Sequence, residues 1–174
     1  MSSLLLTSFR PWKAHQVVNS SDELLAQLLN QNMLPNGVAL LRKIPVHSQI
    51  APMAVMARVF ELRPRVLVCC GMAEKRDRLS LERQGICGDR VVQTPFDLAA
   101  LIAGTIMTEI STDAGRYVCN DLYHHLLAQF ERDRWPIKTL FIHVPPITPN
   151  NTLALSTDFH WVLRKLNQIA IAGA

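Results

Sequence analysis

Short apolar runs alternate along this chain with longer segments in which apolar residues recur at helical spacing. The short runs are almost continuously apolar and end in turn-forming residues. Apolar runs without strict alternation are typical of strands whose two faces are both covered. We therefore predict four buried strands: SLLLTSF (3–9), GVALLRKI (37–44), RVLVCCG (65–71) and KTLFIHVP (138–145).

The segments between these runs carry the signals of helices. The first opens with Ser and acidic residues and then repeats Leu at helical spacing, which gives it a start signal and one apolar face. We predict five helices: SSDELLAQLLNQ (20–31), PMAVMARVFEL (52–62), TPFDLAALIAGTI (94–106), CNDLYHHLLAQFERD (119–133) and STDFHWVLRKLNQIA (156–170). This order of strands and helices predicts an α/β fold, a three-layer α/β/α sandwich with a largely parallel (mixed) central sheet.

The length of 174 residues is that of one domain, so we expect a single domain over residues 1–174. Hydrophobic residues make up 49% and charged residues 18%, which is ordinary globular usage and leaves little room for a disordered tail. The net charge of +4 includes one basic cluster at residues 73–83. No aromatic residues interleave it, so a solvated face is favoured over a nucleic-acid site.

Localisation and redox state follow from the absence of targeting signals. No apolar run is long enough to cross a bilayer, and MSSLLLTSF lacks the features of a secretory signal. We therefore expect a cytoplasmic protein without disulfides. The cysteines fit no zinc spacing, and the neighbours His124 and His125 face different directions on a helix, so no metal is expected.

Three polar residues fall near the predicted carboxyl ends of strands, where open α/β sheets hold their ligands. Cys119 begins the helix 119–133, His143 lies near the end of the last strand, and Glu82 follows the strand that ends at Gly71. A thiol at a helix N-terminus feels the positive end of the helix dipole, so we expect a lowered pKa for Cys119. The same N–H groups could stabilise an oxyanion, and one such donor is worth roughly 100- to 1000-fold in rate.

Each of these residues also has an ordinary structural interpretation. Cys119 could be a small buried hydrophobic residue, and His143 could be a core histidine with its hydrogen bonds satisfied. Glu82 stands in a stretch rich in arginine, so it could be a surface ion-pair partner. A carboxylate is nevertheless what a catalytic imidazole needs to fix its orientation.

The segments that carry these residues resemble the motifs of the pyroglutamyl peptidase (pyrrolidone-carboxylate peptidase) family. AGRYVCN followed by LYHHLL is similar to the nucleophile motif, and FIHVP to the histidine motif. GMAEKRDRLSLER resembles the motif G-x-AGGR-x-x-I-x-x-ER, whose final Glu completes a triad. LLTSFRPW resembles the N-terminal loop LLTGF-x-PFGG. The resemblance spans most of the chain and implies catalytic roles for Cys119, His143 and Glu82 in the family's order.

The departures from these motifs fall on the loops that hold the substrate. Ser8 replaces the first glycine of the N-terminal loop, Lys13-Ala14 replaces its glycine pair, and Glu74-Lys75 replaces the glycines of AGGR. A shorter segment, QGICGDRVV, stands in place of the family's ARIPDN loop. The resemblance implies pocket-lining or substrate-binding roles for Phe9, Trp12, Met72, Tyr117, Val118 and Arg90.

The resemblance thus implies a cysteine exopeptidase that removes N-terminal pyroglutamate from peptides and needs no cofactor. Two alternatives stay open: a hydrolase of the same fold acting on another capped amide or ester, and a non-catalytic binding homologue. A depressed thiol pKa would favour the two enzymes over the binding protein. Family members often associate, so a homodimer or homotetramer is also an expectation.

Overall fold

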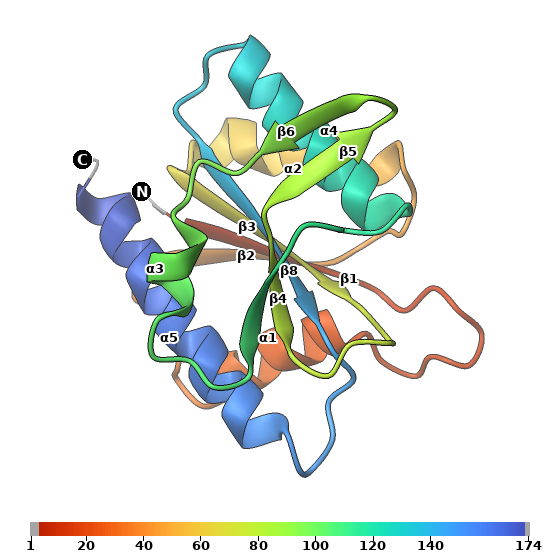
Figure 1. Cartoon of the computed structure of the whole chain (residues 1–174), viewed down its shortest axis with the longest axis vertical. Helices are drawn as coiled ribbons and strands as arrows, with labels where there is room; N and C mark the ends of the chain where they lie inside the picture. Colours follow the sequence, from red (N-terminus) through yellow and green to blue (C-terminus); the bar gives the residue numbers. More distant parts are fainter. Residues whose placement is uncertain (1–3, 173–174) are drawn as a thin grey trace.

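The computed structural model describes residues 4–172 and is built around one six-stranded sheet (Figure 1). The strand order is β2-β1-β3-β8-β4-β7. The first four of these strands are parallel, whereas β4 runs antiparallel to β8 and parallel to β7. Their bounds are β1 (Leu4–Phe9), β2 (Val38–Ile44), β3 (Val66–Met72), β4 (Leu79–Glu82), β7 (Thr108–Ser111) and β8 (Lys138–Val144).

Helices cover both faces of this sheet, as the nearly continuous apolar strands predict. One buried cluster joins the sheet to α1 (Ser20–Asn30), α3 (Leu98–Ile102) and α5 (Thr152–Ala172). A second cluster joins its other face to α2 (Ile50–Leu62) and α4 (Val118–Arg132). Figure 1 shows the two helical layers on either side of the sheet. The predicted three-layer sandwich with a mostly parallel sheet is confirmed.

A hairpin that the sequence analysis did not predict lies outside the main sheet. Its strands are β5 (Gln84–Cys87) and β6 (Arg90–Gln93), joined by a two-residue turn in which Gly88 has φ +56°. The hairpin packs on α4, where a Cβ at Gly85 would lie 2.6 Å from the backbone nitrogen of His124. The Asn120 side chain accepts from Ile86 N at 2.9 Å and donates to Ile86 O at 2.8 Å. This exchange holds the hairpin against the start of α4.

The remaining differences from the expected elements are local. Glu82, which follows the strand that ends at Gly71, is itself the last residue of a short strand, β4, because LSLE pairs with β7 and β8. The helix predicted over 94–106 shortens to Leu98–Ile102, since Asp97 caps its start and the chain leaves it at Ala103 for β7. Among the described residues, no helix is both long and apolar enough to cross a membrane.

The carboxylate of Asp22 ties together α1, β1 and β2. Ser8 Oγ donates to Asp22 Oδ1 at 2.7 Å, and Arg42 donates to both carboxylate oxygens, at 2.8 and 2.9 Å. Burial by itself would raise the pKa of Asp22, but the hydrogen bonds from Arg42 and Ser8 and the charges of Arg42 and Lys43 lower it overall. Ser8, which stands where the family motif has glycine, is thus a buried structural donor.

We predict that Arg42→Met destabilises the protein by about 1–3 kcal/mol, because Asp22 would keep a largely buried charge without its main partner. Since the folded-state pKa of Asp22 is lowered, this stabilisation is present above its ordinary pKa near 3.8 and is lost as pH falls through the folded value. Urea unfolding of parent and variant at pH 7 and in acid measures both effects. Arg58→Met, which breaks an exposed pair with Glu61, is the control. Equal losses in the two variants would contradict this account.

Candidate active site

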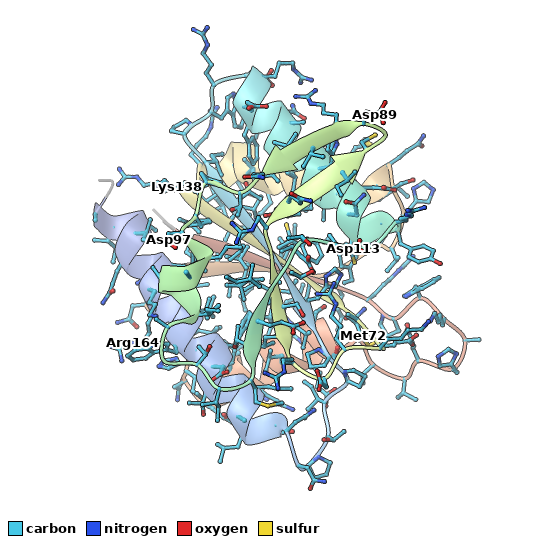
Figure 2. All side chains as sticks on the ribbon, viewed as in Figure 1. Met72, Asp89, Asp97, Asp113, Lys138 and Arg164 are labelled. Carbon is cyan, nitrogen blue, oxygen red and sulfur yellow. The ribbon has the colours of Figure 1, made fainter. Side chains whose placement is uncertain are left out.

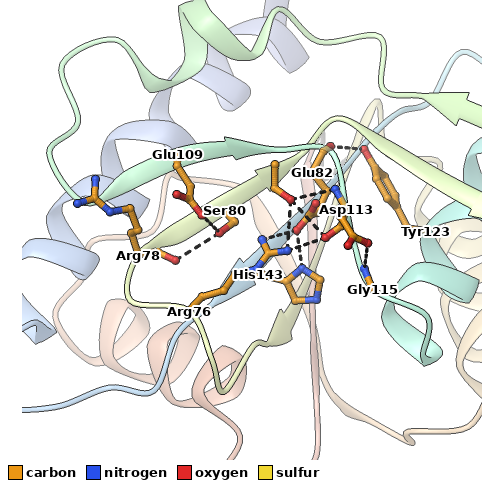
Figure 3. A network of polar contacts seen from close by, with 10 residues as sticks. Arg76, Arg78, Ser80, Glu82, Glu109, Asp113, Gly115, Tyr123 and His143 are labelled. Carbon is orange, nitrogen blue, oxygen red and sulfur yellow. Dashed lines mark hydrogen bonds and ion pairs between the residues drawn. The ribbon is translucent and has the colours of Figure 1, made fainter.

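Strand register brings Glu82 and His143 to one face of the sheet. His143 on β8 stands opposite Gly71 on β3 and Ser80 on β4, and Glu82 stands opposite Phe141. Side chains at alternate positions of a strand, and at paired positions of neighbouring strands, share a face. Phe141, His143 and Glu82 therefore point together toward the layer of α2 and α4. His143 Nδ1 lies 2.7 Å from Glu82 Oε1 (Figure 3).

This acid and base pair is buried. Glu82 has no exposed surface and His143 is 5% exposed. Tyr123, also fully buried, donates its hydroxyl to the backbone oxygen of Glu82 at 2.9 Å and so fixes the strand that carries the acid. With Nδ1 hydrogen bonded to a carboxylate, the imidazole is oriented and Nε2 is the nitrogen left to exchange a proton. Glu82 is therefore not a surface ion-pair residue.

Gly71 brings the thiol of Cys119 to the same place. A Cβ at Gly71 would lie 2.7 Å from Cys119 Sγ and 2.9 Å from Phe141 Cζ, so only glycine leaves room for the sulfur. The neighbour of Gly71 on β8 is His143, and adjacent strands are about 4.8 Å apart. The thiol thus lies over Gly71 of β3, on the face of the sheet that carries the imidazole and one strand away from it. Gly71 could be noticed in the sequence only as the glycine that ends an apolar strand.

Cys119 is the second residue of α4, whose first residue is Val118. Tyr117, the residue before the helix, makes no capping hydrogen bond with its side chain, so the first N–H groups of α4 remain available to a ligand. Cys119 itself is half-buried. A negative atom held near the sulfur could therefore accept hydrogen bonds from the helix start.

The expected lowering of the Cys119 pKa is wrong. Burial, followed by the negative charges of Cys69 in its thiolate form, Glu82 and Asp121, raises the pKa of this thiol to about 12. The backbone N–H of Cys119 acts in the opposite direction but is outweighed. Desolvation and nearby negative charge both disfavour a thiolate, and they exceed what the helix start contributes. Cys119 is a neutral thiol at neutral pH.

The other predicted site residues are spread around the carboxyl ends of the parallel strands. Phe9, at the end of β1, is 2% exposed and belongs to the buried cluster that Val118 and Cys119 border. Met72 ends β3, and its sulfur accepts weakly from the backbone N–H of Ser20. Figure 2 shows Met72 and Asp113 at the end of the sheet opposite Lys138, which starts β8. Trp12 and Tyr117 are exposed residues of the loops at this end.

Arg90 does not lie with the triad. It is on β6 and pairs at 3.4 Å with Glu131, which follows Cys119 by 12 residues along α4, about 18 Å at the rise of a helix. Arg90 also lines a cavity of about 360 Å³ between the hairpin and α4. Asp89, at the tip of the hairpin, is far from Met72 in Figure 2. The hairpin that replaces the family's loop directs Arg90 away from Cys119.

Two of the departures from the family motifs contact each other. Lys13, from the loop after β1, forms an ion pair with Glu74, from the loop after β3. Gln16 Nε2 donates to the same carboxylate at 2.8 Å, and His15 lies 3.3 Å from it. The hydrogen bonds from Lys13 and Gln16 lower the pKa of Glu74 to about 2. These substitutions therefore join two loops that border the site.

Arg76 is a residue of this site that the sequence analysis left without a role. Its guanidinium donates to Glu82 Oε1 at 2.6 Å and to the backbone oxygen of Asp113 at 2.6 Å (Figure 3). The motif GMAEKRDRLSLER contains it, but the sequence does not show which of its three arginines reaches Glu82. Within the described part of the chain, no three His, Cys, Asp or Glu side chains are grouped so as to hold a metal ion.

Comparison with known proteins connects this geometry to a family. The pyroglutamyl peptidase family matches residues 97–159, which include Cys119 and His143. Pyrrolidone-carboxylate peptidase 1 of Photorhabdus laumondii is 25% identical over 218 aligned positions that cover 99% of this chain and 98% of the relative. The pyrrolidone-carboxylate peptidase of Gloeobacter violaceus is 29% identical over 169 positions, 82% of this chain and 80% of the relative.

Solved structures share the fold at lower identity. Pyroglutamyl peptidase I of Bacillus amyloliquefaciens superposes with a TM-score of 0.79 at 19% identity, over 92% of this chain and 94% of the other. The pyrrolidone carboxyl peptidase of Thermococcus litoralis gives a TM-score of 0.74 at 19% identity, over 94% and 92% of the two chains. The sequence matches support the assignment of this chain to the pyroglutamyl peptidase family, and the solved structures show that it shares their fold.

Proposed function

We propose that this protein is a cysteine exopeptidase that removes pyroglutamate from the N-terminus of peptides. Cys119 is the nucleophile, His143 the general base and acid, and Glu82 the residue that orients the imidazole. The observation that carries the proposal is the 2.7 Å contact between His143 Nδ1 and Glu82 Oε1, next to the Gly71 gap that admits the Cys119 sulfur. The names of the curated relatives support the choice of substrate.

In this mechanism the thiol loses its proton as it attacks, since its pKa is about 12 at rest. His143 Nε2 accepts the proton while Cys119 Sγ bonds to the pyroglutamyl carbonyl carbon. The carbonyl oxygen becomes negative and accepts hydrogen bonds from the first N–H groups of α4. The intermediate then expels the amine of the next residue, which takes its proton from His143. Water, activated by the same imidazole, hydrolyses the thioester and frees Cys119.

The pyroglutamyl ring is small, flat and uncharged, so it needs apolar walls and a few polar partners. We assign the walls to Phe9, Trp12, Met72, Tyr117 and Val118, which surround the carboxyl ends of β1 and β3 and the start of α4. Aromatic side chains in the loops can stack on such a ring. The proposal gives Arg90 no part in binding, because Arg90 pairs with Glu131 far along α4.

The proposed reaction uses protein side chains alone and requires a reduced thiol. All four cysteines are free. We therefore assign the reaction to the cytoplasm, where thiols stay reduced, with a pyroglutamyl peptide as substrate and without metal, cofactor, nucleic acid or membrane. Association into a dimer or tetramer stays a prediction.

A second function is supported by one observation, the raised pKa of Cys119. A homologue that binds capped peptides without cleaving them would need no reactive thiolate, and a half-buried neutral thiol suits that role. A third function, a hydrolase with a different capped amide or ester as substrate, is supported by another observation. The Lys13–Glu74 pair stands where the family motifs have glycines in two loops. Both alternatives use the same site and differ from the main proposal in turnover or in substrate.

The first prediction from this proposal concerns turnover. The reduced parent protein should release aminomethylcoumarin from its pyroglutamyl amide, and Cys119→Ala should lower the rate at least about 1000-fold, because the nucleophile is lost. Cys87→Ala removes an exposed thiol on the hairpin and should leave the rate unchanged. The fluorescence of released aminomethylcoumarin measures the rate of each protein. Retained activity in Cys119→Ala would contradict the assignment, whereas inactivity of the parent on a panel of capped amides and esters would favour the binding homologue.

The second prediction concerns the thiol itself. Because the pKa of Cys119 is about 12, alkylation by iodoacetamide should be slow at pH 7 and should accelerate about tenfold per pH unit in alkaline solution. Mass spectrometry of peptides from a Cys87→Ser background, which lacks the exposed thiol, follows Cys119 separately from the buried Cys69 and Cys70. Rapid alkylation of Cys119 at neutral pH would overturn the neutral-thiol description.

A further inference from the structure

The guanidinium of Arg76 connects the acid of the triad to the segment that leads to the nucleophile. It donates to Glu82 Oε1 at 2.6 Å, to Ser111 Oγ at 3.2 Å and to the backbone oxygen of Asp113 at 2.6 Å (Figure 3). Ser111 ends β7, and Asp113 belongs to the segment between β7 and α4. A planar fork of donors suits such simultaneous contacts, whereas a lysine ammonium is a single point charge.

The charge of Arg76 balances a carboxylate that has few other partners. Glu82 has no exposed surface, and Arg76 and His143 contact the same oxygen, Oε1. The other oxygen, Oε2, is buried and has no hydrogen-bond partner among the described residues. A buried charge without compensation is unfavourable, so the carboxylate needs a cation nearby. Without Arg76, the cation nearest to the Glu82 carboxylate would be the imidazolium form of His143.

An imidazolium at that position could not perform the first step of the proposed mechanism, because it cannot accept the Cys119 proton. The positive charge of Arg76 compensates the buried carboxylate of Glu82, so the pair needs no imidazolium for its charge balance. Other titratable groups also surround the pair, on α4, β3 and β7. On α4 these are Tyr123, which donates to the backbone oxygen of Glu82, and Cys119, on which the charges of Glu82, Asp121 and Cys69 of β3 act; on β7 the Glu109 carboxylate accepts from Ser80 Oγ at 2.9 Å. None of these is a permanent cation, as Arg76 is.

The hydrogen bond to the backbone oxygen of Asp113 gives Arg76 a second role, in the structure of the turn before α4. Asp113 Oδ1 accepts from the backbone N–H of Gly115 at 2.9 Å, and Gly115 adopts φ +81° in the turn before α4. Arg76 therefore fixes one end of the turn that sets the position of Cys119. Its side chain is 23% exposed, so it is held between the triad and solvent.

We propose that Arg76 is a positioning residue of the active site. It keeps the Glu82–His143 pair ready to accept a proton by supplying the counter-charge of the buried carboxylate, and it joins that pair to the turn that presents Cys119. This inference rests on the proposed function for its effect on turnover, but the charge balance of the pair can be measured without any turnover.

The test compares Arg76→Gln, Arg76→Lys and Arg78→Gln with the parent. Arg78 lies two residues further along, and among residues 4–172 its side chain has one ionic partner, the exposed Asp77 at 3.8 Å, so Arg78→Gln is the matched control. Arg76→Gln should lower kcat by about 10- to 100-fold with little change in KM. The acidic limb of its pH profile should move upward, because the buried carboxylate of Glu82 then lacks its permanent counter-charge. Arg76→Lys should restore the pH profile but only part of kcat.

A second readout keeps this test separate from the proposed function. The ¹⁵N signals of His143, assigned by their loss in His143→Gln, report the protonation of the imidazole in active or inactive protein. Arg76→Gln should raise the midpoint of this titration, with Arg76→Lys and Arg78→Gln close to the parent. Thermal unfolding checks that each variant is folded. An inactive parent with a raised midpoint in Arg76→Gln would count against the peptidase only. An unchanged midpoint, or an unchanged kcat in an active protein, would overturn the role of Arg76.

Discussion

The hydrogen bond between Glu82 and His143 is the constraint on which the rest of the site depends. It crosses from β4 to β8, two antiparallel strands whose register places Ser80 opposite His143 and Glu82 opposite Phe141. A fully buried carboxylate is tolerated only with partners. The guanidinium of Arg76 accordingly donates to the Glu82 carboxylate, and the Tyr123 hydroxyl donates to the backbone oxygen of Glu82 and so fixes the strand.

Two contacts hold the nucleophile: its sulfur packs over Gly71, which has no side chain, and the start of its helix is attached to the hairpin. Gly71 leaves the volume that the Cys119 sulfur occupies, and Asn120, the next residue, holds the hairpin through both polar atoms of its amide. The hairpin in turn approaches α4 closely at Gly85. The start of α4 is thus fixed on two sides, which suits a reaction that depends on placing a sulfur accurately.

Much of the fold could be predicted from the sequence. The apolar runs of β1, β2, β3 and β8 and the amphipathic helices indicated the three layers, and motif resemblance singled out Cys119, His143 and Glu82. The short strands β4 and β7 could not be found by hydrophobicity, since four residues with polar neighbours carry too little pattern. The hairpin did carry a signal, the Gly88-Asp89 turn between Ile86 and Val91, which the sequence analysis did not use.

Electrostatics was the least predictable part of the site. The position of Cys119 at a helix start suggested an easily ionised thiol, but the surrounding apolar groups and negative charges raise its pKa. The resemblance implied a substrate-binding role for Arg90, yet Arg90 lies on the hairpin and pairs with Glu131. Both outcomes depend on contacts between segments distant in sequence. The Lys13–Glu74 pair is another such contact, which shows that two separate departures from the family motifs belong together.

The most direct measurement is the mass of the protein after acid quenching during turnover of a pyroglutamyl ester. Attack by Cys119 with His143 as base predicts a transient increase equal to one pyroglutamyl acyl group, on the peptide that contains Cys119 and labile to hydroxylamine as a thioester is. Turnover without this adduct, or an adduct on another residue, would contradict the account.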